Sequence, residues 1–327
     1  MIINELFSIK NLNSKIYFKK LTLQIENNTM KSIFYYLTII FGIFALASCS
    51  PNQDDNGDFL YGIDYDPTTT DPGSGSETTK LLEKVSGVDS DGESTTVTYT
   101  YTDKKLTSVK TEVGTDTETA LLTYSNDVIT HMDITNVESG DTKLTKVDLL
   151  YNSGKLVGAN GTTESGGAVL YKSTTNVTYV GDKVSKVVTS MNTEDPDNPG
   201  QYILSFEVTS DLTYTGNNIS VWKLTTTTAS TPPIVIPPIV IESELSNYDS
   251  NKNPFGTLPL AYNILSTHYN TSNQGMLGLS TNNYRSVKVT TMGFSQPLNM
   301  TYTYDADGYP ITMLSSGGDK LNFQYTK

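Results

Sequence analysis

Short runs in which apolar and polar residues alternate recur along most of the chain. Residues 96–101 read Thr-Val-Thr-Tyr-Thr-Tyr, so Val97, Tyr99 and Tyr101 share one face and the threonines share the other. The same alternation returns at residues 298–304. Such runs of β-branched and aromatic residues, bounded by Gly, Asn, Asp and Ser, predict half-buried antiparallel strands. No sustained apolar spacing of three and four accompanies them, so we expect an all-β fold with helix as a minor component at most.

A tyrosine repeat punctuates these runs. In each copy a tyrosine is followed by a polar turn, by an apolar residue five positions on, and often by another at eight. The copies are Tyr101 (Leu106, Val109), Tyr124 (Ile129, Met132), Tyr151 (Leu156), Tyr179 (Val184, Val187), Tyr214 (Ile219, Trp222) and the clearest turn, Tyr304-Asp-Ala-Asp-Gly-Tyr309. A strand, a tight turn and a returning strand make one hairpin per copy. The two apolar residues of a copy are three positions apart, so in a regular strand their side chains would point to opposite faces. Either a bulge or a sheet buried on both faces is therefore required.

The repeated hairpins predict an antiparallel meander over residues 80–327. We expect it to curl into an open barrel or a strongly twisted sheet, with a β-sandwich as the alternative. One segment departs from the pattern, because residues 232–236 and 237–241 both read Pro-Pro-Ile-Val-Ile. Paired prolines cannot donate to a ladder, so we expect an edge or a loop there.

The first fifty residues carry a targeting signal. Residues 1–29 differ from the rest, and we interpret them as an extension upstream of a true start at Met30. Residues 30–48 read as a signal peptide, with a lysine after Met30 and an apolar stretch over residues 33–47. A retained transmembrane anchor is the alternative, although a spanning helix needs about 20 apolar residues.

The end of this signal resembles a bacterial lipobox. Leu46, Ala47 and Ser48 precede Cys49, which is the single cysteine of the chain. The resemblance implies that Cys49 is diacylated, becomes the mature N-terminus and holds the protein on a membrane. A chance cysteine after an ordinary signal peptide is the alternative.

Residues 49–79 predict an acidic flexible tether after this cysteine. The segment is rich in Pro, Gly, Ser, Thr and Asp, a composition typical of solvated linkers. Gln53-Asp54-Asp55 resembles the acidic export signals of Bacteroidetes surface lipoproteins, although a generic acidic linker explains it nearly as well. We therefore expect an outer-membrane lipoprotein and leave open whether it faces the cell surface or the periplasm.

Two segments also resemble a known group of proteins. Residues 302–310 (YTYDADGYP) resemble the YD (RHS-like) repeat and its relatives in Bacteroidetes lipoproteins of the DUF4595 type, and residues 248–255 (YDSNKNPF) resemble a segment of flavobacterial members. The resemblance spans about residues 80–327 and implies a β-hairpin architecture. It brings no catalytic motif with it.

Charge and chemistry narrow the function. The chain has 36% hydrophobic residues, enough to form a hydrophobic core. It has 22 basic and 35 acidic residues and a net charge of −13, and an acidic surface repels phosphate backbones, so a nucleic-acid partner is not expected. His131 and His268 lie too far apart in sequence to form a zinc site by themselves. Acidic turns at residues 89–93, 195–198 and 305–308 lack the remainder of a calcium loop. We expect no cofactor and assign no catalytic, cofactor-binding or metal residue.

The leading hypothesis is therefore a non-catalytic binding or structural module anchored to a membrane, with a glycan or a protein as its ligand. The rival is a glycan-directed hydrolase, because acidic residues can meet in space without a sequence signature. The repeat tyrosines favour core packing over sugar stacking.

Overall fold

The computed structural model describes residues 80–88, 92–229, 236–269 and 275–326. These ranges contain sixteen strands and three short helical segments. The first eight strands are β1 (Leu82–Val88), β2 (Ser94–Thr102), β3 (Lys105–Val113), β4 (Asp116–Ser125), β5 (Val128–Glu138), β6 (Asp141–Asn152), β7 (Lys155–Ser165) and β8 (Ala168–Val180). The others are β9 (Lys183–Glu194), β10 (Tyr202–Thr215), β11 (Asn218–Thr228), β12 (Ile239–Ser246), β13 (Ser286–Thr291), β14 (Phe294–Tyr304), β15 (Pro310–Ser315) and β16 (Lys320–Tyr325).

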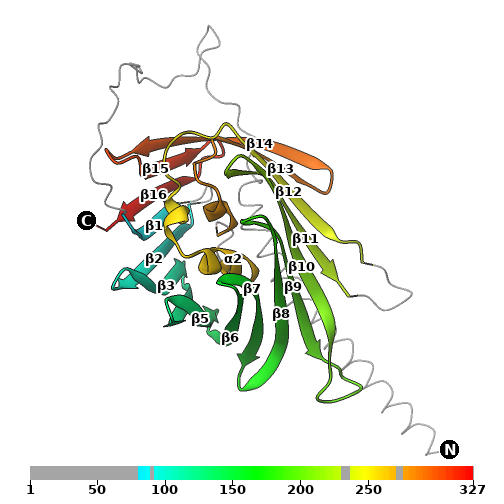
Figure 1. Ribbon diagram of the computed structural model, residues 1–327. Helices are drawn as coiled ribbons and strands as arrows, with labels where there is room; N and C mark the ends of the chain where they lie inside the picture. The colour runs from blue at the N-terminus through cyan, green and yellow to red at the C-terminus, as the bar shows by residue number, and fades with distance from the viewer. Residues whose placement is uncertain (1–79, 89–91, 230–235, 270–274, 327) are drawn as a thin grey trace, which may run out of the picture. The chain divides into compact units, whose positions relative to one another are not determined.

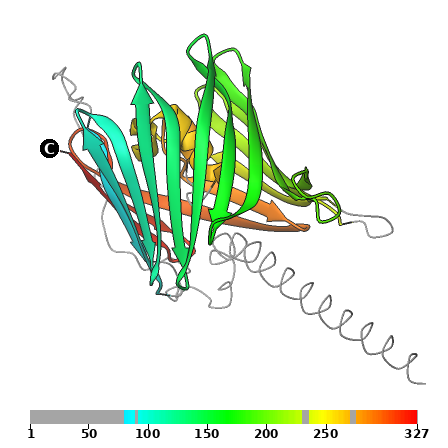
Figure 2. The same ribbon diagram turned by 90° about the horizontal axis from the view of Figure 1, so that it is seen from below.

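The strands form a closed barrel in which each strand pairs antiparallel with its neighbours in sequence. Figure 1 shows them as a ring, and Figure 2 shows the same hairpins from below. The ring closes because β1 pairs with β16, with Val85 opposite Phe323. The all-β meander is confirmed, and its barrel is closed where an open form was expected. Closure removes the two sheet edges that an open meander would expose.

Every tyrosine hairpin contains a bulge that resolves the odd spacing of the repeat. In the first copy Tyr101 pairs with Leu106 and Thr100 pairs with Ser108, so no residue of β2 lies opposite Thr107 in the strand pairing. The extra residue turns both Leu106 and Val109 inward, where both are buried. The same register shift occurs beside Tyr124, Tyr151, Tyr179, Tyr214 and Tyr304.

The inward face of the barrel is largely apolar at mid-height, and the outward face is polar. One inward row of paired residues runs Leu122, Met132, Val147, Gly161, Ser173 and Met191. One outward row runs Ser108, Leu121, Asp133, Lys146, Thr162 and Lys172. Exposed aliphatic residues such as Leu121 and Leu150 interrupt the polar face at a minority of positions. This distribution is the reverse of a transmembrane barrel, whose outer band is apolar and whose interior is polar.

A plug between β12 and β13, described over residues 247–269 and 275–285, enters the barrel. It contains η1 (Pro254–Thr257), α2 (Leu260–Tyr269) and η2 (Met276–Leu279), and α2 lies inside the ring of strands in Figure 1. Sixteen strands enclose a lumen too wide for their own side chains to fill. The plug supplies the missing apolar volume, since Ile264, Leu265 and Met276 are fully buried.

Two sequence expectations need correction or completion. The second Pro-Pro-Ile-Val-Ile copy was expected at an edge or in a loop, but Ile239 opens β12, which pairs with both β11 and β13. The strand tolerates the two prolines because Pro237 and Pro238 precede it, so every backbone N–H that β12 needs for pairing comes from a later residue.

The signal, the lipobox with Cys49 and the tether fall on residues 1–79, outside the described ranges. None of the helices within those ranges combines enough length and hydropathy to span a bilayer.

Candidate functional site

One end of the barrel is formed by the turns that follow β2, β4, β6, β8, β10 and β14. It carries a tyrosine rim, defined as Tyr101, Tyr124, Tyr151, Tyr179, Tyr214 and Tyr304. Several rim hydroxyls donate to a backbone carbonyl on a neighbouring hairpin: Tyr151 to Ile129 (2.8 Å) and Tyr179 to Leu156 (2.9 Å). Tyr151 and Tyr179 are thereby tied to the preceding copy of the repeat. These two tyrosines therefore have a structural role, in line with the packing role that the sequence favoured.

Lysines cover several of these rings. The Lys155 ammonium lies 5.3 Å from the centre of the Tyr179 ring, and the Lys183 ammonium lies 5.4 Å from the centre of the Tyr214 ring. Lys155 also forms an ion pair of 2.8 Å with Asp182, which lowers the pKa of that carboxyl by hydrogen bonding and charge. Lys183 donates to the Gly216 carbonyl. The turns at this rim are thus held by cations that sit on aromatic faces.

We predict that Tyr179→Phe destabilises the barrel and that Tyr214→Phe does not to the same extent. The Tyr179 hydroxyl donates to Leu156, whereas within the described ranges the Tyr214 hydroxyl has no hydrogen-bond partner. A lost hydrogen bond of this kind costs about 0.5–1.5 kcal/mol. Urea unfolding of the two variants measures the difference. Equal midpoints would mean that the stitching bond contributes nothing.

The plug is fixed to the rim by polar side chains from residues 248–255. Asp249 accepts from the backbone N–H groups of Asn251 (2.9 Å) and Asn283 (3.2 Å) and from the Tyr304 hydroxyl. The Asn253 side chain caps η1 by accepting from the Phe255 N–H at 3.1 Å. The segment that resembles the flavobacterial lipoproteins is therefore the entry of the chain into the barrel.

Helix α2 is anchored deep inside the barrel at its C-terminal end. The Tyr269 hydroxyl lies 3.0 Å from Ser173 Oγ and 3.1 Å from Thr175 Oγ1. Gly161 leaves room for this ring, because a Cβ there would lie 2.6 Å from Tyr269 Cε1. His268 Nε2 lies 3.1 Å from Ser210 Oγ.

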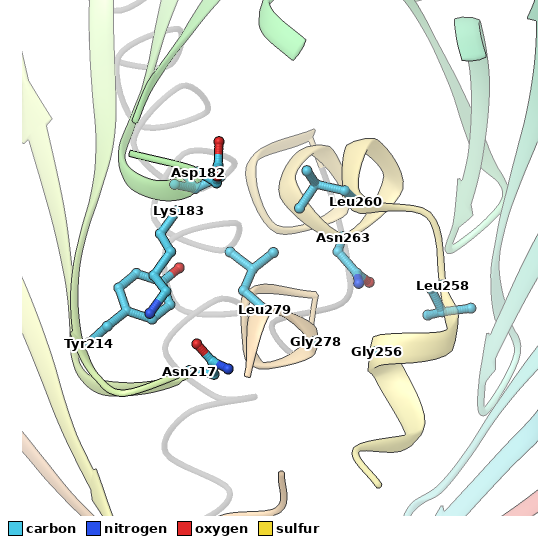
Figure 3. Close-up of a pocket in the computed structure, with 11 residues that line it drawn as sticks. Asp182, Lys183, Tyr214, Asn217, Gly256, Leu258, Leu260, Asn263, Gly278 and Leu279 are labelled. Atoms are coloured by element: carbon cyan, nitrogen blue, oxygen red, sulfur yellow. The ribbon is translucent and has the colours of Figure 1, made fainter. Parts of the chain in front are cut away.

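A cavity of about 240 Å³, the rim pocket, separates the plug from the barrel wall. The wall contributes Asp182, Lys183, Val184, Tyr214 and Asn217, and the plug contributes Gly256, Leu258, Leu260, Asn263, Gly278 and Leu279. In Figure 3 the Lys183 side chain lies along the Tyr214 ring on the wall side, and Leu260 and Leu279 lie on the plug side, with Asn263 beyond Leu279. The pocket thus lies where two hairpin turns of the wall approach the start of α2.

Asn263 is the buried polar residue of the pocket. Its side chain is 2% exposed, and its Nδ2 donates to the Phe255 carbonyl at 2.9 Å. Gly278 permits this position, because a Cβ at Gly278 would lie 2.5 Å from Nδ2. Asn263 Oδ1 has no hydrogen-bond partner among the described residues. This oxygen is closed off from solvent, so it is an unsatisfied acceptor of the packed interior and not a group that the cavity reaches.

Across the pocket, burial raises the pKa of the Tyr214 hydroxyl to about 12, with a smaller contribution from nearby Tyr248. The phenol is therefore protonated at neutral pH and able to donate. The wall thus lines the pocket with the polar side chains of Asp182, Lys183, Tyr214 and Asn217, and the plug adds the apolar side chains of Leu258, Leu260 and Leu279.

The titratable residues named from sequence lie elsewhere and apart. His131 lies on the outer face between Asp148 (2.7 Å) and Asp133 (3.2 Å), whereas His268 is buried inside the barrel. The described ranges hold no group of three or more His, Cys, Asp or Glu residues placed to bind a metal.

The acidic turns use their carboxylates for local contacts. Asp195 accepts from the Asp197 N–H at 2.9 Å, and Asp305 accepts from the Asp307 N–H at 3.0 Å. Lys80 bridges Asp305 and Asp307 at 2.7 Å and 2.6 Å. Residues 89–91 of the third acidic turn lie outside the described ranges.

Sequence reasoning missed Asn263 and the whole pocket. A signal was available in residues 260–269 (LAYNILSTHY), where Ala261, Ile264, Leu265 and His268 follow helical spacing. An asparagine among these apolar residues marks a polar group that the helix carries into the core.

No protein-family model and no curated protein sequence matches the chain. Among solved structures, a porin-like protein from Bacteroides vulgatus ATCC 8482 is similar, with a TM-score of 0.48 and 14% sequence identity. That similarity covers 76% of this chain and 99% of the other chain.

Proposed function

We propose that this chain is a cell-envelope lipoprotein, anchored to the outer membrane through Cys49, whose barrel is a non-catalytic binding module. The observation that carries the proposal is the rim pocket, which is lined by two hairpin turns of the wall and by the plug. Its lining combines leucine side chains with polar and charged ones, and a concave site with both kinds of contact is able to hold a small molecule.

The side-chain distribution supports a barrel that works in water. Polar residues cover its outer face, and the plug occupies part of its lumen. A bilayer would leave outward-facing Lys146 and Asp133 in hydrocarbon, at a high free-energy cost. The lipid on Cys49, and not the barrel, would then hold the protein on the membrane, at the cell surface or on the periplasmic face.

The hydrolase alternative receives less support. A glycosidase needs one carboxylic acid and one carboxylate on either side of the scissile bond. Two acidic pairs that the described strands and turns bring together are bridged by a base: Asp305 and Asp307 by Lys80, and Asp133 and Asp148 by His131. Partial burial of Asp305 opposes its ionisation, but hydrogen bonds from Lys80 and from the backbone N–H groups of Tyr309 and Asp307 lower its pKa overall, the opposite of what a general acid requires.

We predict that labelled palmitate enters the wild-type protein and does not enter Cys49→Ala. The reason is that Cys49 is the sole thiol in the chain and stands at the end of the lipobox-like tetrad. The variant should also leave the membrane fraction. Equal labelling of both proteins would contradict anchoring at Cys49.

The same purified chain, tested on polysaccharide, peptide and ester panels, should show no turnover. Reproducible turnover that is lost when one Asp or Glu becomes alanine, with the fold retained, would establish the hydrolase instead.

A further inference from the structure

Two copies of the tyrosine repeat neutralise a rim lysine with the aspartate of the next copy. In both, the lysine stands four positions after its rim tyrosine, and the aspartate stands three positions after the next rim tyrosine. Lys105 pairs with Asp127 at 2.5 Å, and Lys155 pairs with Asp182 at 2.8 Å. The repeat thus places a carboxylate at the same position beside both of these lysines.

A third lysine, Lys183, stands at the same place of the repeat but lacks the carboxylate, because Asn217 occupies the position of the aspartate. Within the described ranges Lys183 contacts the Gly216 carbonyl and the Tyr214 ring, and no acidic side chain forms an ion pair with it. Lys155 makes the corresponding carbonyl and ring contacts in addition to its ion pair. A lysine ammonium has three N–H donors, so Lys183 is able to bind an acceptor where the other copies place a carboxylate.

The missing carboxylate coincides with the rim pocket. Lys183 and Asn217 both line the cavity of about 240 Å³, whereas neither Lys105 nor Lys155 does. Lys183 is also half-buried, whereas the other two lysines are exposed. Figure 3 shows the Lys183 amino group over the Tyr214 ring, with Asn217 on the same side of the cavity. A half-buried cation without a counter-ion carries a desolvation cost, so an anion that enters the cavity is favoured.

The other lining residues favour a small anion with one charge and an apolar part. Asp182 lines the same cavity and is already paired with Lys155. One negative charge balances Lys183, whereas the second charge of a phosphate dianion would be unbalanced and repelled by the acidic chain. The plug contributes three leucine side chains on the facing side, which offer apolar contact to a short hydrocarbon group.

We propose that the rim pocket binds a small monocarboxylic acid, whose carboxylate takes the place of the missing repeat aspartate at Lys183 and whose apolar part contacts the leucines of the plug. This inference rests on the proposed binding function and names its ligand class. A free short-chain acid and the C-terminal carboxylate of a peptide that ends in a small apolar residue share this chemistry.

The test is ligand-observed NMR with the full chain in mild detergent, at neutral pH and low salt. The free acids are acetate, butyrate and isovalerate, and a peptide end is represented by N-acetylvaline and glycylglycylvaline. Isovaleramide is the uncharged counterpart of isovalerate, and inorganic phosphate is the multiply charged probe. We expect at least one carboxylate to bind the wild type, and neither isovaleramide nor phosphate to displace it.

Restoring the repeat aspartate is the most specific variant. Asn217→Asp should pair with Lys183 as Asp182 pairs with Lys155, and it should therefore weaken carboxylate binding by at least about tenfold. Its matched control is Asn126→Asp, which adds the same charge to a rim turn whose residues do not line the pocket. The control should bind the carboxylate as the wild type does.

Removing the cation is the second variant. Lys183→Met keeps a long side chain but has no charge, so it should also weaken binding by at least about tenfold. Lys105→Met is its control, because it removes the equivalent lysine of a copy that does not line the pocket, and its binding should be unchanged. Circular dichroism of all four variants checks that the barrel is folded.

The outcomes separate this inference from the function on which it rests. Binding of the free acids without the two valine derivatives supports the proposal with a free acid as the ligand, and the reverse supports a peptide end. Isovaleramide or phosphate that binds as tightly as the carboxylates overturns the carboxylate class and leaves a binding module. Carboxylate binding that either pocket variant leaves intact overturns Lys183 as its site, and no binding by any probe overturns the inference.

Discussion

Replacing Leu265 with alanine should lower the free energy of unfolding by about 2–5 kcal/mol, the range measured for leucine truncations in close-packed cores. Leu265 belongs to α2 and is 0% exposed. The helix lies inside a closed barrel, so the strands cannot collapse onto the space without distorting their ladder. A cavity therefore remains, and its cost adds to the lost apolar burial.

Leu260→Ala is the matched control, because it makes the same chemical change at the start of the same helix on a side chain that is 47% exposed. Surface substitutions of this kind change stability by less than about 0.5 kcal/mol. Urea unfolding of the full chain with both variants measures the difference. Similar midpoints for the two would show that α2 does not pack inside the barrel.

The hairpins were predictable because their information is local. A tyrosine, a two-residue turn and an apolar residue five positions on specify a hairpin through turn chemistry alone. The turn of the first copy, Asp103-Lys104, has positive φ at both residues (50° and 64°), as the tight turn required. The parity of the repeat left two alternatives open, a bulge or a sheet buried on both faces, and the register shows the bulge with Thr107 as the extra residue.

Closure and the plug were not predictable in the same way. Pairing of β1 with β16 joins residues more than 230 positions apart, and no local pattern specifies which strand meets the first one. Helix α2 has polar and aromatic residues around its circumference, and eight of its ten residues are buried. A helix surrounded by a barrel has no solvent face, so it lacks the polar stripe that identifies an amphipathic helix.

The rim pocket depends on the second of these long-range features, the plug. Its wall comes from two hairpin turns, whereas the residues opposite, Asn263 among them, come from the plug. The sequence supplied the residue types at each place, but the pocket exists only because the plug enters at the tyrosine rim. This explains why the candidate acids and histidines attracted attention in the sequence while a single asparagine did not.

The two histidines should give opposite contributions to the pH dependence of stability. Burial without charge lowers the pKa of His268 to about 4 from its ordinary value of 6.5, and its Nδ1 has no partner among the described residues. Around His131 partial burial opposes protonation, but hydrogen bonds and charges from Asp148 and Asp133 raise the pKa overall. The pKa values of the two histidines are therefore shifted in opposite directions.

The direction for His268 follows from its lowered pKa. The unfolded chain takes up the proton below pH 6.5, whereas the folded chain resists it until about pH 4. The contribution of His268 is thus complete above pH 6.5 and is lost as the pH falls from 6.5 to 4, by on the order of 3 kcal/mol. His268→Gln should therefore have a shallower decline in unfolding free energy over that interval than the wild type.

His131→Asn is the comparison, because the contribution of His131 has the opposite sign. A raised folded pKa stabilises the protein below pH 6.5 and is lost as the pH rises through the folded value. Its removal should steepen the acid decline slightly, since the site is on the outer surface. Unfolding free energies measured between pH 4 and pH 8 for the three proteins settle the signs. If the unfolding free energy of the wild type falls with pH in parallel with that of His268→Gln, His268 is not shielded from solvent in the folded protein. The C-terminal end of α2 would then open to water.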